Sequence, residues 1–182
     1  MQYFVKKGKA NTDSTLNIAV ERAKELGIKH LVVASCSGET ALKLASSGLN
    51  VVCVTHQVGF NKPGEDEMPK NIREELEEAG IKVLTTTHLL AGVDRALRFK
   101  FQGVYPAEII ASTLRMFGQG MKVCVEVAVM ALDAGLIPYG EEIVAVGGTG
   151  VGADTAMVLT PAHSAYIFDT NIKEILCMPR GH

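Results

Sequence analysis

The chain has 182 residues, of which 47% are hydrophobic and 21% are charged, and its formal net charge is −2. This composition is typical of a globular domain and excludes a disordered tail, a collagen-like chain and a coiled coil. The slightly acidic charge, the 5% of aromatic residues and the absence of tryptophan argue against nucleic-acid binding.

The first half of the chain alternates helix and strand patterns. After Thr12, Asp13 and Ser14, apolar residues recur at helical spacing until Gly27, which indicates a capped amphipathic helix. Short apolar runs rich in valine then alternate with helical segments, as in a βαβαβ unit with a parallel sheet. The predicted elements are helices over residues 12–26, 39–47 and 69–78 and strands over 30–34, 51–55 and 81–85.

The second half is less regular, and its longest apolar stretch is ambiguous. The valines of residues 121–134 favour a strand, but the segment is long and lacks strict alternation, so we predict a mostly buried helix. No repeat, low-complexity run or linker interrupts the chain, and residues 1–182 are interpreted as a single domain. The remaining predicted elements are a partly helical segment over 88–103, a helix over 106–117 and strands over 142–146, 156–160 and 172–178.

A turn at residues 35–40 follows a predicted parallel strand and precedes a helix. It contains the hydroxyls of Ser35, Ser37 and Thr40 beside Gly38. Ligands of open α/β sheets bind at the carboxyl ends of strands, and a helix N-terminus offers unpaired N–H groups to an anion. We therefore favour a phosphate site at this turn over the alternative, an ordinary helix cap made by Ser35 or Ser37.

A glycine-rich loop at residues 147–155 follows another predicted strand. Gly148, Gly150 and Ala153 match the G-x-G-x-x-A pattern of dinucleotide sites. That pattern should open a long helix, and Pro161 leaves room only for a short segment, so we reject a dinucleotide site here. A loop that flanks a ligand and a plain connection between strands both stay open.

The four cysteines are interpreted as free thiols of a reducing compartment, because they are far apart in sequence and form no Cys-x-x-Cys motif. No apolar run reaches the ~18 residues of a membrane span, and the start of the chain lacks the apolar stretch of a signal peptide. We therefore expect a cytoplasmic protein without a membrane partner. The histidines and cysteines show no metal-ligand spacing, and we expect no metal.

Cys36 lies at the predicted start of a helix, where a thiolate is stabilised, so it is a candidate nucleophile. Its base would be His56 or His88, which follow other predicted strands. The alternative, a small buried side chain without a catalytic role, is the interpretation we favour. Two acidic runs, at residues 65–67 and 74–78, predict solvated faces. Basic residues that could meet a phosphate or an acidic partner are Arg95, Arg98 and Lys100.

Several segments together resemble a known family. Residues 31–41 (LVVASCSGETA), with a Ser-Gly-x-Thr-Ala turn at 37–41, and residues 51–55 (VVCVT) resemble the C-terminal α/β domain of pyruvate kinase. Gly140 and Glu141, which lead to the 147–155 loop, resemble the end of that domain. The resemblance to stand-alone proteins of this type in archaea and some bacteria covers nearly the full chain. It rests on residues 19–35, 122–126, 152–155 and 174–179.

The resemblance implies an α/β fold, a three-layer sandwich in which a mostly parallel sheet has helices on both faces. In pyruvate kinase this domain is not catalytic, and in some members it binds an allosteric sugar phosphate on the turn that matches residues 35–40. Phosphoryl transfer belongs to a separate barrel of roughly 250 residues, so we expect no pyruvate kinase activity. The 147–155 loop is richer in glycine than its kinase counterpart, so the ligand need not be the kinase effector.

Stand-alone relatives imply a binder of a phosphate-bearing small molecule, and we take flavin mononucleotide (FMN) as the first candidate and cofactor. The alternative is an enzyme that uses bound flavin, or Cys36 or His56, to act on a phosphorylated metabolite. The subunit contacts of this domain in the kinase imply a homo-oligomer. We expect Phe60 to stack on a ligand ring and Arg95 to pair with its charge. The predicted binding residues are Ser35, Cys36, Ser37, Gly38, Glu39, Thr40, Thr55, His56, Gly59, Phe60, Arg95, Gly148, Thr149, Gly150, Gly152, Ala153, Asp154 and Thr155.

Overall fold

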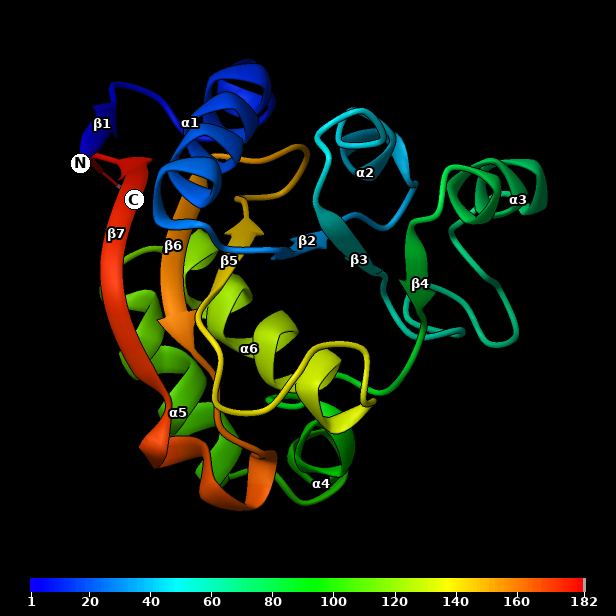
Figure 1. Ribbon diagram of the computed structural model, residues 1–182. Coiled ribbons are helices and arrows are strands. Elements are labelled where there is room, and N and C mark those ends of the chain that lie inside the picture. The colour runs from blue at the N-terminus through cyan, green and yellow to red at the C-terminus, as the bar shows by residue number, and fades with distance from the viewer. Residues whose placement is uncertain (182) are drawn as a thin grey trace.

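The computed structural model describes residues 1–181 and is built around one seven-stranded sheet (Figure 1). The strands are β1 (Gln2–Phe4), β2 (His30–Ala34), β3 (Asn50–Val54), β4 (Lys82–Leu84), β5 (Ile143–Gly147), β6 (Thr155–Thr160) and β7 (Asn171–Pro179). Their order across the sheet is β1-β7-β6-β5-β2-β3-β4. β6 is antiparallel to β5 and β7, and the other four pairings are parallel. The predicted mostly parallel sheet is confirmed.

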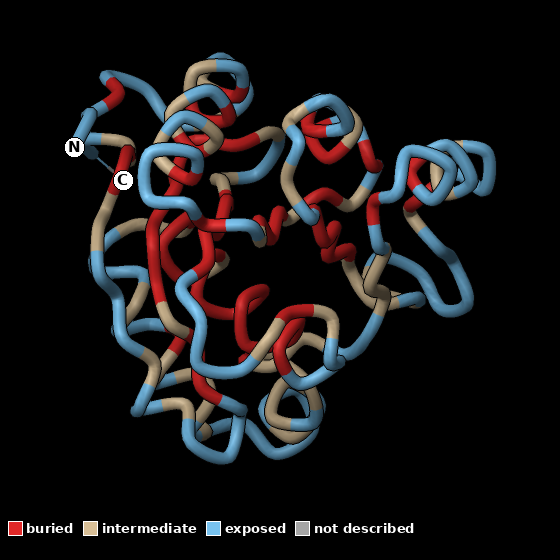
Figure 2. The backbone as a smooth tube through the Cα atoms, viewed as in Figure 1, coloured by how far each residue is buried: buried red, intermediate tan, exposed pale blue. Residues whose placement is uncertain are grey.

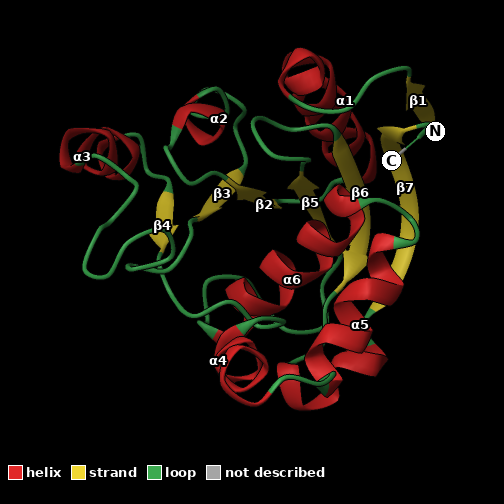
Figure 3. Cartoon of the chain, turned by 180° about the vertical axis from the view of Figure 1, so that it is seen from behind, coloured by secondary structure: helices red, strands yellow, loops and turns green. Residues whose placement is uncertain are grey.

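Helices cover both faces of the sheet, which confirms the three-layer α/β arrangement (Figures 1 and 3). On one face lie α1, α2 and α3. On the other, α6 packs directly on the strands, and α4 and α5 lie beyond it. The helices are α1 (Thr12–Leu26), α2 (Glu39–Leu42), α3 (Lys70–Glu78), α4 (Gly92–Phe101), α5 (Pro106–Arg115) and α6 (Gln119–Asp133).

The sheet separates two hydrophobic clusters, and alternate residues of each central strand contribute to opposite sides. In β2, Leu31 and Val33 pack toward α1, whereas Val32 packs toward α6. The whole run is apolar because both faces of the strand are covered. Figure 2 shows the consequence: the central strands and α6 are buried, while α4 and α5 are mostly intermediate or exposed.

The long helix predicted over residues 39–47 is wrong, because α2 stops at Leu42. Beyond it the backbone N–H groups of Leu44, Ala45 and Ser47 each bond to the carbonyl three residues earlier, so the chain continues as tight turns. The residues before Gly48 include two serines, which are weaker helix formers than alanine or leucine. The other predicted helices and strands are present, with ends that shift by a few residues.

Three short elements near the ends of the chain were not predicted. β1 pairs with β7 and so places the two ends of the chain side by side (Figure 1). Two 3₁₀ helices lie at Lys9–Asn11 and Ser164–Asp169. Such elements are too short to leave a periodic signal. Within residues 1–181, every helix is too short or too polar to cross a membrane.

Candidate functional site

A cavity of about 870 Å³ lies at the carboxyl ends of β2 and β3. The strand ends contribute Ala34 and Val54, and the residues just after them contribute Cys36 and Thr55. Its other walls come from the loop after β3 and from α4, α5 and α6. This is the edge of a parallel sheet at which α/β proteins bind their ligands.

Three aromatic rings and a guanidinium gather at the cavity beside the loop that follows β3. The His56 imidazole stacks on the Phe60 ring with 3.9 Å between centroids, and the centroid of His88 lies 5.1 Å and 5.2 Å from these two rings. The guanidinium carbon of Arg95 lies 5.0 Å from the Phe60 centroid and 5.5 Å from that of Phe99. Cation–π attraction therefore holds Arg95 in place without neutralising it.

The charges that line the cavity do not balance. Among the described residues, four basic side chains but only two acidic ones line it. Arg98 pairs with Glu108 at 2.8 Å, and Lys122 pairs with Glu126. Arg115 donates to the Gln119 side chain at 2.8 Å, and no carboxylate of residues 1–181 pairs with it or with Arg95. The cavity therefore has two guanidinium groups whose charge is uncompensated.

An ion pair is buried in the wall that α6 provides. Lys122 and Glu126 are 6% and 4% exposed and lie four residues apart on the helix. The second carboxylate oxygen of Glu126 accepts the backbone N–H of Leu90 at 2.8 Å. Burying two charges is costly unless they are paired and hydrogen-bonded, and here both conditions are met. The contact with Leu90 also ties α6 to the segment that carries His88.

His88 is held in its neutral form. Burial lowers its pKa from the usual 6.5, because the imidazolium would lose solvation in the cavity wall. Glu126 opposes this shift, whereas His56 and Lys122 add to it. A neutral imidazole adds no charge to the cavity at pH 7.

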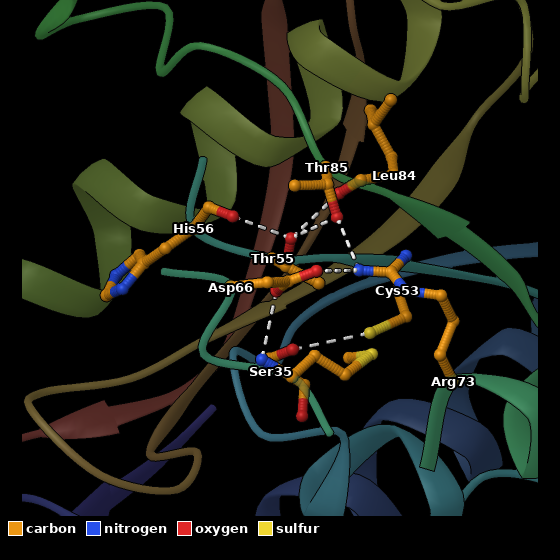
Figure 4. Close-up of polar contacts among 9 residues, drawn as sticks. Ser35, Cys53, Thr55, His56, Asp66, Arg73, Leu84 and Thr85 are labelled. Carbon is orange, nitrogen blue, oxygen red and sulfur yellow. Dashed lines mark hydrogen bonds and ion pairs between the residues drawn. The ribbon is translucent and has the colours of Figure 1, made fainter. Parts of the chain in front are cut away.

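The loop between β3 and α3 is fixed by side-chain contacts. His56 Nδ1 lies 2.6 Å from Glu67 Oε2, and Asn61 donates to the other oxygen of Glu67 at 2.6 Å. Figure 4 shows the polar contacts of Arg73, which bonds to Asp66 at 2.9 Å and to the hydroxyl of Thr85 at 3.0 Å. The Thr85 hydroxyl in turn lies 2.7 Å from that of Thr55. The position of the His56 ring is therefore determined by a connected network.

The model of the family "Pyruvate kinase, alpha/beta domain" matches residues 13–159, which include every residue of the cavity. The chain belongs to this family.

Solved pyruvate kinases of Cryptosporidium parvum are also similar to this chain. One is 16% identical over 81% of this chain and 22% of its own, with a TM-score of 0.43. Another, in complex with ADP, is 16% identical over 92% of this chain and 23% of its own, with a TM-score of 0.41. The pyruvate kinase α/β domain described here thus spans about a fifth of the length of these enzymes.

The structure brings five of the predicted binding residues of this pyruvate kinase α/β domain to the cavity. The others lie outside its lining, in the 35–40 turn, at Gly59 and in the 147–155 loop. The ring of Phe60, which we expected to stack on a ligand, already has His56 on one face. The five residues that line the cavity are Cys36, Thr55, His56, Phe60 and Arg95.

The 35–40 turn has both a structural role and free hydrogen-bond donors. The buried hydroxyl of Ser35 accepts the backbone N–H of Ala41 at 3.4 Å, which is the capping role weighed as an alternative. Gly38 has φ of 85°, and a Cβ there would lie 2.4 Å from Ile72 Cγ2, so packing against α3 requires glycine. No acceptor within residues 1–181 meets the backbone N–H groups of residues 36–38.

The 147–155 loop packs against the protein itself. A Cβ on Gly148 would lie 2.2 Å from the carbonyl oxygen of Gly152, and one on Gly152 would lie 2.4 Å from the Thr12 hydroxyl. Asp154 accepts the backbone N–H of Gly8 at 2.8 Å and the Thr155 hydroxyl at 2.8 Å. Close packing thus accounts for these glycines. Thr149 lines a smaller cavity of about 240 Å³, which shares Arg115 and Gln119 with the larger one.

The environment of Cys36 does not favour a thiolate. Burial raises the pKa of its thiol to about 11, and the charge of Glu67 raises it further, while a contact with the His56 backbone opposes them. The expected stabilisation by a helix N-terminus fails because α2 has only four residues. Cys36 is therefore a neutral thiol in the cavity wall at pH 7.

Sequence reasoning missed several charged residues of the site. Glu67 was assigned to a solvated acidic run, yet it holds His56. The pair Lys122 and Glu126 had a usable signal, because two opposite charges four residues apart interrupt an otherwise apolar helix. Arg115 had none, since a lone arginine on an amphipathic helix is ordinary.

Proposed function

We propose that this chain binds a phosphate-bearing small molecule in the cavity. The observation that carries the proposal is the uncompensated charge of Arg95 and Arg115 within one cavity. Guanidinium groups form paired hydrogen bonds to two oxygens of a phosphate, which makes arginine well suited to this ligand. Val123, Val127 and Met130 of α6 give the same cavity an apolar wall for the remainder of the molecule.

The 35–40 turn stays a predicted second anchor for the phosphate. Cys36 links it to the cavity, and the backbone N–H groups of residues 36–38 have no acceptor within the described chain. Against it stands the negative charge of Glu39, which lies on the same turn. Its carboxylate pairs with Lys9 at 3.3 Å. The arginines therefore have the stronger support.

FMN fits the chemistry of the lining and is the first ligand to test. Its phosphate suits the free guanidinium groups, and its planar ring suits an apolar wall beside aromatic side chains. Since His56 occupies one face of Phe60, the ring would have to pack elsewhere in the cluster. When bound, flavin supplies oxidation and reduction chemistry.

The first experiment is an absorption and mass spectrum of the purified protein, followed by titration with FMN. We expect yellow protein, or colourless protein that quenches added flavin fluorescence. Arg95→Gln should weaken binding by at least about tenfold, because a charge-assisted hydrogen bond contributes about 1.5–3 kcal/mol. Lys100→Gln, on the same helix but outside the cavity, is the matched control. A protein that binds none of the three ligands FMN, pyrophosphate and a sugar phosphate would reject the proposal.

We also propose that the chain forms a homo-oligomer. No residue of α4 and only Ala111 of α5 is buried, and large apolar side chains are exposed on or beside both helices. Helix faces of this kind are normally covered. Light scattering after gel filtration tests this, and a monomer with and without FMN would reject it. The exposed apolar residues outside the cavity are Val93, Phe99, Phe101 and Phe117, and Val104, Ile109 and Met116 are exposed but line the cavity.

A cytoplasmic location is part of the same proposal. All four cysteines are free thiols, and three of them are buried. Unpaired cysteines are typical of a reducing compartment. Fractionation of the native cells with an antibody against the chain tests this.

A further inference from the structure

A carboxylate–histidine pair adjoins the cavity. His56 lines the cavity, and Glu67 holds its Nδ1 from behind at 2.6 Å. We propose that His56 is a general base which Glu67 positions, and that the cavity catalyses proton transfer on a phosphorylated carbonyl compound. The inference rests on the proposed function, since the substrate is the phosphate-bearing molecule that the cavity binds.

The hydrogen bond to Glu67 selects the tautomer of His56. A carboxylate only accepts hydrogen bonds, so Nδ1 carries the proton and Nε2 carries the lone pair. No residue within 1–181 forms a hydrogen bond with Nε2. The same carboxylate stabilises the imidazolium that forms when Nε2 takes a proton, as in other histidines oriented by an acid.

Glu67 is well placed for this role because its neighbours fix it. Asn61 holds its second oxygen, and the adjacent Asp66 accepts the backbone N–H of Met68 at 3.0 Å and pairs with Arg73. An orienting group must not rotate with the ring it orients. A flexible surface glutamate would not have this network on both sides.

The cavity also contains groups that complement a base. Proton removal next to a carbonyl places negative charge on the carbonyl oxygen, which needs a nearby donor or cation. The ammonium of Lys122 is buried in the cavity wall, and only one of its three N–H groups is used by Glu126. The neutral ring of His88, 5.1 Å from that of His56, is placed to pass a proton onward.

The reaction balances without a further reactant. His56 Nε2 takes the proton from the carbon next to the carbonyl, and the C–H electron pair forms a C=C bond. The carbonyl electrons move to oxygen, which Lys122 stabilises. The imidazolium then returns the proton to the same carbon. Alternatively it passes the proton to His88, which gives its own N–H proton to the carbonyl oxygen, so that the enol tautomer forms and both histidines end neutral. This step requires a carbonyl beside a C–H bond, and the free arginines require a phosphate, which together define the substrate class.

The experiment follows carbon-bound protons of two probes, dihydroxyacetone phosphate and ribulose 5-phosphate, by proton NMR in D₂O with the full chain. Calorimetry measures probe binding in parallel. We expect probe signals to disappear through exchange, at least about 100-fold more slowly with His56→Gln. Glu67→Gln should slow exchange at least about tenfold at unchanged probe affinity, and Glu67→Asp should restore part of it.

The chain offers a matched control in a second histidine–carboxylate pair. His163 Nδ1 lies 2.8 Å from Asp133 Oδ1, and neither residue lines the cavity. His163→Gln and Asp133→Asn should leave exchange unchanged. A general effect of losing such a pair would appear in both.

Each outcome decides the inference. Exchange that depends on His56 and Glu67 but not on His163 supports it. Probes that bind without exchange, or exchange that persists in His56→Gln, overturn it and leave the proposed function intact. If FMN binds but neither probe does, the substrate class is wrong. If FMN, pyrophosphate and the two probes all fail to bind, both the proposed function and this inference are wrong.

Discussion

The 147–155 loop and the 870 Å³ cavity lie at the same edge of the sheet, yet they differ in whether their polar groups have partners within the protein. In the loop, Asp154 accepts the Thr155 hydroxyl and the backbone N–H of Gly8, and Gly147, Gly148 and Gly152 lie close to neighbouring backbone. In the cavity, Arg95 and Arg115 have no carboxylate partner, and Nε2 of His56 has no hydrogen-bond partner among the described residues.

This difference distinguishes residues that serve the packing of the protein from residues that are available to a ligand. Glycine and hydroxyl side chains in a loop indicate that the backbone approaches something closely, but that neighbour can be the protein itself. Cationic groups that meet no carboxylate inside a cavity are available to an anionic ligand, and they indicate a ligand more directly. The predictions below test whether the loop serves stability and the cavity serves binding.

The largest expected effect concerns the buried pair in the cavity wall. Lys122→Met leaves the carboxylate of Glu126 buried with only the Leu90 N–H as partner, and we expect a loss of about 3–5 kcal/mol in the free energy of unfolding. The double variant Lys122→Met with Glu126→Gln removes both charges and keeps an acceptor for Leu90, so it should regain most of the loss. Urea denaturation measures both. Equal losses in the two variants would contradict this account.

The next effect concerns packing against the 147–155 loop. A Cβ on Gly120 of α6 would lie 2.0 Å from the Thr155 hydroxyl oxygen, so Gly120→Ala should cost about 2–3 kcal/mol even though alanine favours helix. Gly181→Ala is the control, because within residues 1–179 no atom lies within 4 Å of its Cβ. Urea midpoints of the two variants check this. A Gly120→Ala protein as stable as the parent would mean that this contact relaxes freely.

Most of the fold was readable because its elements follow the chain's own periodicity. The apolar runs of β2 and β3 and the capped pattern of α1 indicate their structures locally. Residues 121–134 were decided correctly by length and spacing, although their valines favour a strand. The predictions that failed concern elements that depend on contacts distant in sequence. The helix α2 ends early in tight turns, and β1 was not predicted because it forms by pairing with the edge of β7.

The candidate site was only partly readable from the sequence. His56, Phe60 and Arg95 were found because they follow strand ends or add charge, and the structure brings them together. Glu67 and Arg115 reach the site through loop geometry and helix orientation, which no short motif encodes. The sequence left two interpretations of the 147–155 loop open, a loop that flanks a ligand and a plain connection, and close packing accounts for Gly148 and Gly152.

A third prediction compares the two proposed phosphate anchors by ligand affinity. Thr40→Asp adds negative charge to the 35–40 turn and should abolish FMN binding if the phosphate lies there. If the arginines hold the phosphate, as we propose, Thr40→Asp should weaken binding less than Arg95→Gln does. Titration by fluorescence quenching, with Thr113→Asp on the cavity wall as a positive control, ranks the variants. A Thr40→Asp effect larger than that of Arg95→Gln would move the anchor to the turn.

The smallest expected effect is a pH dependence of stability that arises in the cavity. Burial lowers the pKa of His88 below its usual 6.5, so the unfolded chain binds this proton more readily than the folded one. The free energy of unfolding should therefore fall as the pH drops below about 6.5, and the effect should be absent above it. His88→Gln removes this proton linkage and should flatten that part of the profile. Urea denaturation of both proteins between about pH 8 and pH 5 measures the difference.

The double variant Lys122→Met with Glu126→Gln should also change the slope of this pH profile, because Glu126 opposes the pKa shift of His88 and Lys122 adds to it. Such a change would link His88 to the buried pair. Parallel profiles for the parent and His88→Gln would show instead that His88 is solvated, and the cavity would then lack the neutral second base.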